Sequence, residues 1–185
     1  MTMPSPSPIR PVLSHMGIYV HDMDAMEDFY TRVMGLVVTE RGKAFRFPID
    51  LVFLSSRPDV HHQLALASGR PEDATYSVIN QMSFAVESLD ELREMSRRVT
   101  AEAVRDLVQI NHGNAWSLYF LDPEGNRVEV YLDSPWHVPQ PHGDDLDLEM
   151  SNDEIMRTTL DAIRNDPGFM PREQFEAEMQ RKMDA

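Results

Sequence analysis

Two stretches of patterned hydrophobic residues follow one another along the chain with the same order of elements. In the first, residues 14–20 are predicted to form a strand, residues 24–35 a helix with one apolar face, and three strand-like runs end with residues 61–67. In the second, residues 79–86 form a strand, a capping box begins a helix at Ser88, and three more strands follow. The pattern therefore predicts two successive βαβββ modules.

The two stretches also match each other in sequence. The match begins at His15 in HMGIYVHDMDAM and at Gln81 in QMSFAVESLDEL, an offset of 81 − 15 = 66 positions. Both runs start with a polar residue, Met and a small residue, followed by aliphatic or aromatic residues and Val. Such a repeat indicates two copies of one unit, each too small to bury its sheet alone. The expected fold class is α+β, with tandem modules at about 12–70 and 78–135 forming a curved, partly closed mixed sheet around a metal cavity.

The segments outside the repeat differ from it in composition. Residues 1–11 hold four prolines among serines, which predicts a disordered arm before the paired domain at 12–135. Residues 136–185 begin as a Pro/His/Asp-rich connector and continue with a capping box at Ser151 and two helices. We expect this C-terminal extension to be a clasp over a sheet edge or a dimer seam, in preference to a lid over the site.

Composition limits the chemistry and the partners. The 185 residues include no cysteine, so a bound metal would need His, carboxylate or amide ligands. A formal charge of −14 argues against nucleic acid and anionic membranes as partners. Because the sequence shows neither a signal peptide nor a long apolar segment, we expect a cytoplasmic protein with a small-molecule substrate.

Four polar positions are candidates for a shared site, because the first and last strands of paired modules converge. They are His15, Gln81, Glu129 and the stretch 61–63. A carboxylate such as Glu129, flanked by valines, is costly to bury unless a cation or hydrogen bonds satisfy it. Alternatively, His15 is a hydrogen-bonded core residue and Glu129 faces solvent. Their occurrence at equivalent ends of the repeat favours a metal site.

Four stretches resemble the vicinal-oxygen-chelate superfamily, and especially the catalytic domain of type I extradiol dioxygenases. They are residues 14–36, 60–67, 79–92 and 116–131. The sequence DPEGNRVEVY is common across that superfamily and indicates the fold, whereas HHQLALA is the more dioxygenase-like element.

The resemblance implies a role for each candidate residue. His15 and Glu129 would bind the metal, Fe(II) by preference, and His62 would act as acid or base, with His61 as the reserve and a substrate contact. Tyr119 matches the tyrosine that hydrogen-bonds the substrate in those enzymes. Two further expectations concern His112 and the assembly. His112 is a candidate polar contact with the substrate at the cavity mouth, although a loop histidine facing water is the favoured interpretation. A homodimer is expected for a small single-domain enzyme of this type.

Gln81 departs from the pattern, since the family has a second metal-binding His at this position. Glutamine is a weaker, neutral oxygen donor, and it resembles a ligand of some glyoxalase I enzymes, whose sites act as Lewis acids with metals such as Mn, Zn or Ni. That reading needs a ligand from the last strand of module one. If the last strands of the two modules are also offset by 66 positions, Gln63 corresponds to Glu129, and with an offset of 67 His62 does. Alternation along the strand would instead turn the side chains of His61 and Gln63 to the cavity.

Three functions remain open. A ring-cleaving dioxygenase acting on a small aromatic diol is favoured, a glyoxalase-type isomerase or lyase acting on a dicarbonyl-type substrate is the alternative, and a non-catalytic small-molecule binding protein is the third. Retention of His15 and Glu129 argues for a metal and places the binding protein last.

Overall fold

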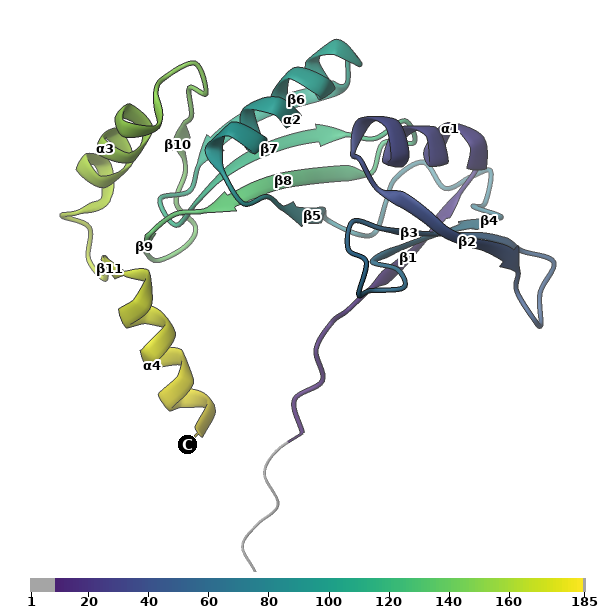
Figure 1. Cartoon of the computed structure of the whole chain (residues 1–185), viewed down its shortest axis with the longest axis horizontal. Coiled ribbons are helices and arrows are strands. Elements are labelled where there is room, and N and C mark those ends of the chain that lie inside the picture. The colour runs from purple at the N-terminus through teal and green to yellow at the C-terminus, as the bar shows by residue number, and fades with distance from the viewer. Residues whose placement is uncertain (1–8, 185) are drawn as a thin grey trace, which may run out of the picture. The chain divides into compact units, whose positions relative to one another are not determined.

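The computed structural model describes residues 9–184 and divides the chain into two compact units, Met1–Glu72 and Asp73–Ala185. Each unit carries one βαβββ module, and the second also carries the C-terminal extension (Figure 1). Most of the predicted N-terminal arm, residues 1–8, lies outside the described residues, and residues 9–11 form neither helix nor strand.

The first unit is a four-stranded sheet with one helical segment packed on one of its faces. Its elements are β1 (Met16–Val20), α1 (Met23–Asp28), the π-helix η1 (Phe29–Val33), β2 (Val37–Lys43), β3 (Asp50–Ser55) and β4 (Leu64–Ser68). Asp22 begins α1 by accepting a hydrogen bond from the Ala25 amide at 3.0 Å. The strand order is β1-β4-β3-β2, with β1 parallel to β4.

The core of the first unit lies between this helical segment and one face of the sheet. Met26, Phe29 and Tyr30 are buried on the helical side, and Leu54 and Leu66 are buried on the sheet. Alternation along the strands sends the neighbouring side chains to the opposite face, which the unit's own helix does not cover. The face that carries the candidate residues is therefore open within this unit.

The second unit repeats the arrangement and extends it. Its elements are β5 (Met82–Ala85), α2 (Leu89–Ala101), β6 (Arg105–Asn111), β7 (Ala115–Leu121), β8 (Arg127–Asp133), β9 (Trp136–His137), β10 (Asp144–Asp145), α3 (Asn152–Ile163), β11 (Met170–Pro171) and α4 (Arg172–Asp184). The main sheet has the order β10-β6-β7-β8-β5, with β5 parallel to β8. Helix α2 begins at the Ser88 cap and buries Leu92, Met95 and Val99. These elements confirm the α+β class and the two βαβββ modules expected from the sequence.

The C-terminal extension is held to the second unit by several contacts. Strand β10 pairs with the edge strand β6, and Arg93 of α2 donates hydrogen bonds to the carbonyls of Leu148 at 2.8 Å and Met150 at 2.6 Å. Helix α3 buries Ile155 and Ile163 against the unit. Helix α4 has no buried residue and is joined to the unit through the short β9–β11 pair (Figure 1).

The strand registers show which positions of the two modules correspond. Met16 pairs with Leu64 in the first unit, and Met82 pairs with Val128 in the second. The first strands are therefore offset by 82 − 16 = 66 positions, but the last strands by only 128 − 64 = 64. This shorter offset makes Ala65 the counterpart of Glu129, so both registers considered from the sequence, with Gln63 or His62 in that place, are wrong.

Candidate functional site

In the second unit, the candidate residues meet in one row across neighbouring strands. Tyr119 of β7 and Ser83 of β5 are the Cα partners of Glu129 on either side of β8. The Tyr119 hydroxyl donates to Glu129 Oε1 at 2.5 Å, and the Ser83 hydroxyl donates to Oε2 at 2.5 Å. Gln81, which directly precedes β5, donates from Nε2 to Oε2 at 2.7 Å. Three residues singled out from the sequence, Gln81, Tyr119 and Glu129, therefore come together here, and Ser83 joins them as a residue that the sequence did not indicate.

Glu129 is a buried acid with neutral partners. Its residue is 8% exposed, and the three donors that contact it, a phenol, an amide and an alcohol, carry no charge. A buried carboxylate is costly unless its charge is balanced as well as hydrogen-bonded. Because the three donors stabilise the charge without neutralising it, the environment of Glu129 suits a carboxylate that binds a cation.

Gln81 is oriented in the present arrangement as a donor. Its Nε2 donates to Glu129 and, at 3.1 Å, to the Ser83 hydroxyl, while its Oε1 accepts from the Asn80 side chain at 3.4 Å. Turning the amide by half a rotation would bring Oε1 to the carboxylate, and two oxygen acceptors are stable side by side only with a cation between them. The amide therefore fits a metal in the flipped orientation.

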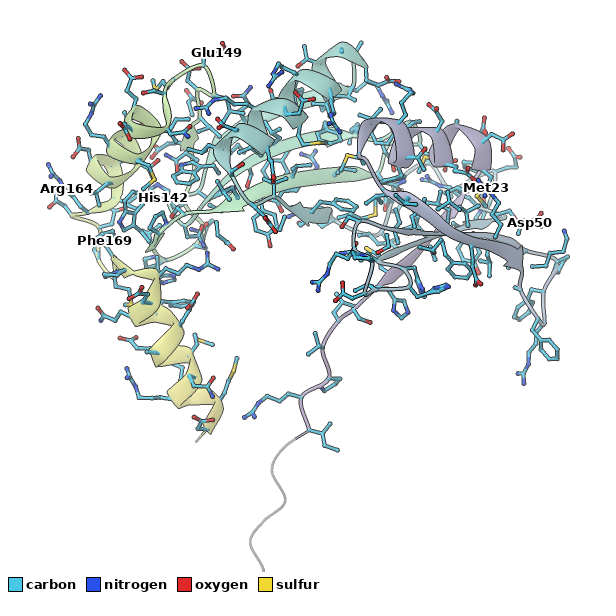
Figure 2. The ribbon with its side chains drawn as sticks, in the orientation of Figure 1. Met23, Asp50, His142, Glu149, Arg164 and Phe169 are labelled. Carbon is cyan, nitrogen blue, oxygen red and sulfur yellow. The ribbon has the colours of Figure 1, made fainter. Side chains whose placement is uncertain are left out.

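Tyr119 is linked to His112 as well as to Glu129. Burial, followed by the hydrogen bond to Glu129, raises the pKa of Tyr119 to about 12, so the phenol keeps its proton. The His112 Nε2 atom lies 2.9 Å from the Tyr119 hydroxyl, and its Nδ1 lies 2.7 Å from the backbone carbonyl of His142. His142 is in the connector near the end of α3, 3.7 Å from Asp166 (Figure 2). His112 is thus held at both ring nitrogens instead of facing water.

Four of the residues described above line a cavity of about 350 Å³ on the open face of the second sheet: Ser83, His112, Tyr119 and Glu129. Its remaining lining comes from β7, β8 and the loops beside them: Asn114, Ala115, Tyr131, Asp133 and Gln140. Ser117 belongs to the same face of β7, and its buried hydroxyl has no hydrogen-bond partner among residues 9–184. The lining combines two aromatic rings, those of Tyr119 and Tyr131, with several polar groups, as small-molecule sites commonly do.

In the first unit, three imidazoles gather at the start of β1 and β4. The Ser14 hydroxyl lies 3.0 Å from His15 Nδ1, which leaves His15 Nε2 free of that contact. The His15 and His62 rings are 4.3 Å apart between centroids, and Phe53 of β3 lies 4.9 Å from the His62 ring. Burial, with the charges of His15 and His61, lowers the pKa of His62, so this ring is predominantly neutral near neutral pH.

The stretch before β4 is a loop and not the strand predicted from HHQLALA. Strand β4 begins at Leu64, so alternation along a strand does not decide where His61 and Gln63 point. The Gln63 Oε1 atom accepts hydrogen bonds from the Ser56 amide at 2.9 Å and the Ser56 hydroxyl at 2.8 Å. Gln63 therefore supports the β3–β4 connection, which corrects the suggestion that it faces the cavity.

The candidate metal ligands are divided between the units, with His15 in the first and Gln81 and Glu129 in the second. Within the described residues, neither unit by itself gathers three His, Asp or Glu side chains that could hold a metal ion. The donor atoms nevertheless fit a divalent metal: the first unit offers the imidazole nitrogen of His15, and the second offers the amide oxygen of Gln81 and the buried carboxylate of Glu129.

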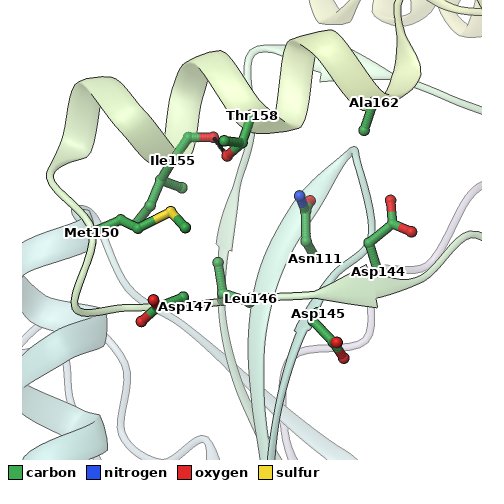
Figure 3. Close-up of a pocket in the computed structure, with 9 residues that line it drawn as sticks. All are labelled: Asn111, Asp144, Asp145, Leu146, Asp147, Met150, Ile155, Thr158 and Ala162. Carbon is green, nitrogen blue, oxygen red and sulfur yellow. Dashed lines mark hydrogen bonds between the residues drawn. The ribbon is translucent and has the colours of Figure 1, made fainter.

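The acidic connector lines a second cavity, for which the sequence offered no role. About 410 Å³ lies between α3 and strands β6 and β10 (Figure 3). Asp144, Asp145 and Asp147 line it together with apolar side chains that include Leu146 and Ile155. Figure 3 shows Met150 reaching into the gap beneath α3 and Asp145 directed away from the helix.

No helix among residues 9–184 is both long and apolar enough to cross a bilayer.

Comparison with known proteins shows sequence similarity to two dioxygenases. A biphenyl-2,3-diol 1,2-dioxygenase 3 of Rhodococcus globerulus is 28% identical over 131 residues, 68% of this chain and 65% of that protein. A biphenyl-2,3-diol 1,2-dioxygenase 2 of the same organism is 25% identical over 128 residues, 67% of this chain and 64% of that protein. The matched part of the chain thus spans just under two thirds of the length of these relatives.

Solved structures show the same fold at lower sequence identity. A glyoxylase/bleomycin resistance protein/dioxygenase domain from Frankia sp. EAN1pec superposes with a TM-score of 0.55 at 19% identity, covering 69% of this chain and 100% of that one. The trypanothione-dependent glyoxalase I of Leishmania major gives a TM-score of 0.55 at 18% identity, covering 95% of this chain and 100% of that one.

The family profile described as Glyoxalase/Bleomycin resistance protein/Dioxygenase superfamily matches residues 12–130. This span includes both modules up to β8, and with them all seven candidate site residues. The chain therefore belongs to the Glyoxalase/Bleomycin resistance protein/Dioxygenase superfamily.

Proposed function

We propose that this protein is a metal-dependent ring-cleaving dioxygenase of the extradiol type, acting on a small aromatic vicinal diol in the cytoplasm as a homodimer. The observation that carries the proposal is the buried carboxylate of Glu129, which sits among neutral donors and in register with Tyr119. Both Rhodococcus relatives bear names of enzymes that act on biphenyl-2,3-diol, a vicinal aromatic diol.

The proposed metal is Fe(II), with His15, Gln81 and Glu129 as ligands. When bound, such a metal supplies a positive centre that a vicinal diol can chelate and redox chemistry that oxygen requires. Imidazole, amide and carboxylate donors are compatible with iron and also with Mn, Zn or Ni. Mn(II) is the metal in a FosX structure from Listeria monocytogenes, which shares the fold.

The other residues of the site have roles that follow from their contacts. Tyr119 keeps its hydroxyl proton and can donate it to a substrate oxygen, because its pKa is raised to about 12. His62 is neutral and can accept or return a proton at Nε2, which would supply roughly 10²–10⁴-fold in rate. His112 supports Tyr119 from the other side, and His61 contacts His62.

The second candidate function, a glyoxalase-type isomerase or lyase, is favoured by one residue and opposed by another. Gln81 suits a Lewis-acid site better than it suits iron. However, Ala65 is the counterpart of Glu129 in the first unit and offers no ligand atom, which leaves such a site one donor short. We therefore rank the dioxygenase first and the binding protein without a metal third.

The test is metal analysis of protein purified anaerobically, for the wild type and for His15→Ala and Glu129→Ala. His21→Ala and Glu149→Ala are matched controls, since both residues are exposed and lie outside the proposed ligand set. Near-stoichiometric iron that is lost in both ligand variants and kept in both controls would support the proposal. The same preparations are then screened with catechols for yellow ring-opened products.

Other outcomes separate the alternatives. Zinc or nickel at the same occupancy, with no ring-opened product, would favour the Lewis-acid enzyme. No metal under any loading condition would overturn both enzyme functions. A Gln81→His variant, which introduces the imidazole of the family pattern, is expected to retain more iron through dialysis than the wild type.

A further inference from the structure

Glu40, His61 and His62 form a chain of hydrogen bonds in the first unit. His61 Nε2 lies 3.1 Å from Glu40 Oε2, and His61 Nδ1 lies 2.8 Å from His62 Nδ1. Glu40 is on the edge strand β2 and pairs with Phe53 of β3, immediately after a register shift that begins at Val38. The Phe53 ring contacts both imidazoles, at centroid distances of 5.5 and 4.9 Å. The three polar side chains are thus held side by side by the strand register and by one aromatic ring.

Counting protons along this chain determines which nitrogen of each ring carries hydrogen. An ionised Glu40 can only accept, so His61 Nε2 must carry a hydrogen. A neutral His61 then has a lone pair on Nδ1, and the single hydrogen between the two Nδ1 atoms must belong to His62. A neutral His62 with hydrogen on Nδ1 has a free lone pair on Nε2.

We propose that Glu40 and His61 are positioning residues that hold His62 in the tautomer with a free Nε2 lone pair, ready to accept a proton from the substrate. This inference rests on the proposed function in one respect, the role of His62 as acid or base. It assigns a positioning role to Glu40, which the sequence did not single out, and to His61, which the resemblance gave as a substrate contact and as the reserve for His62. It requires no residue of the second unit.

A simple surface ion pair is the competing explanation for the Glu40–His61 contact. The side chains of Glu40 and His61 are 68% and 52% exposed, and exposed ion pairs contribute little to stability. The tautomer ratio of His62 depends on the difference in hydrogen bonding between its two neutral forms, which is a separate quantity from the contribution of the Glu40–His61 pair to folding stability. Groups that orient a functional histidine in this way typically change activity by about 10–100-fold when removed.

The test is ¹⁵N NMR of the histidine rings in metal-free protein at about pH 8.5, well above the usual histidine pKa of about 6.5, so that the rings are neutral. In the wild type, His62 is expected to be protonated at Nδ1 and His61 at Nε2. His61→Phe keeps a ring against Phe53 but removes the acceptor, so His62 should shift to a mixture of tautomers. Glu40→Ala should produce a smaller shift in the same direction.

Two further variants complete the test. Asp50→Ala removes another exposed, paired carboxylate from the same β2–β3 pair and should leave His62 unchanged. Glu40→Gln retains an oxygen that accepts from His61 and should restore the wild-type tautomer. If His62 carries its hydrogen on Nε2 in the wild type, or if all variants share one tautomer, the proposal is overturned.

This experiment is independent of ring cleavage, because it uses neither metal nor substrate. Failure to bind iron would refute the proposed function and leave the tautomer measurement intact. If the catechol screen succeeds, Glu40→Ala should lower kcat about tenfold with KM unchanged, and Glu40→Gln should recover most of the loss. Equal activity of Glu40→Ala and wild type would count against a positioning role.

Discussion

Thr159→Val is expected to destabilise the protein strongly, although the two side chains have nearly the same shape. The Thr159 hydroxyl in α3 accepts hydrogen bonds from Asn111 Nδ2 at 2.9 Å and from Trp116 Nε1 at 2.8 Å. All three residues are buried, with exposures of 0, 5 and 2% in that order. Valine would leave two buried donors without an acceptor, at about 1–3 kcal/mol each, so the expected loss is roughly 2–6 kcal/mol.

The assay is thermal and urea unfolding of the purified variant. A loss of about 2 kcal/mol, the lower end of the range, corresponds to a decrease in Tm of about 4–8 °C for a chain of this size. Thr158→Val is the matched control on the same helix. Among the described residues, the exposed Thr158 hydroxyl donates only to the helix carbonyls of Glu154 and Ile155, so this substitution should change stability by less than about 0.5 kcal/mol. If Thr159→Val costs no more than Thr158→Val, α3 is not docked through this network and the reasoning is wrong.

Three further predictions concern the hairpin, the extension and the site. Gly113→Ala should lower the free energy of unfolding by about 2–5 kcal/mol, because Gly113 has φ +72° and a Cβ there would lie 2.6 Å from the Val138 side chain. Gly42→Ala is the control and should be neutral, because the space around Gly42 is open. Arg172→Ala removes a 2.8 Å bridge from the first residue of α4 to β8, so limited proteolysis should cut α4 faster while global stability changes by less than about 1 kcal/mol. Tyr119→Phe should lower kcat/KM for a catechol about 10–100-fold, as expected for a lost hydrogen bond to a charged group, and unchanged turnover would exclude Tyr119 from the site.

Much of the fold could be predicted from the sequence because the local signals agree with each other. The caps at Ser88 and Ser151 begin helices where predicted, with Ser88 accepting from the Glu91 amide at 3.2 Å and Ser151 from the Glu154 amide at 3.3 Å. The reciprocal bond of a capping box is present at Ser151, whereas the Glu91 side chain accepts from the Glu87 amide instead of the Ser88 amide. The order of elements repeats in both units. Strand β4 begins at Leu64, three residues later than HHQLALA predicts. The side chain of Gln63 accepts hydrogen bonds from Ser56 in the β3–β4 connection, which no local signal in the sequence indicates.

The candidate site could be predicted in part, and for a physical reason. Glu129 and Tyr119 are ten positions apart on strands joined by a short turn, so their register follows from local geometry. The resemblance gave Tyr119 a contact with the substrate, and its hydrogen bond to Glu129 appears only in the structure. The counterpart of Glu129 depends on a parallel pairing between β1 and β4, which no local signal specifies. Glu40 was missed because it meets His61 across 21 positions through a shift in the β2–β3 register.

The two units use one scaffold position in different ways, which suggests how their roles are divided. In the second unit the carboxylate of Glu129 is on β8, between β7 and β5, where burial makes an unbalanced charge costly and a cation beneficial. In the first unit, Ala65 occupies the position that corresponds to Glu129. The carboxylate of that row belongs to Glu40 on the edge strand β2, where water solvates it at little cost. A buried carboxylate suits metal binding and an exposed one suits orientation of a histidine. On these grounds we expect substitutions of Glu129 to abolish metal retention, and substitutions of Glu40 to leave metal content unchanged while altering proton transfer.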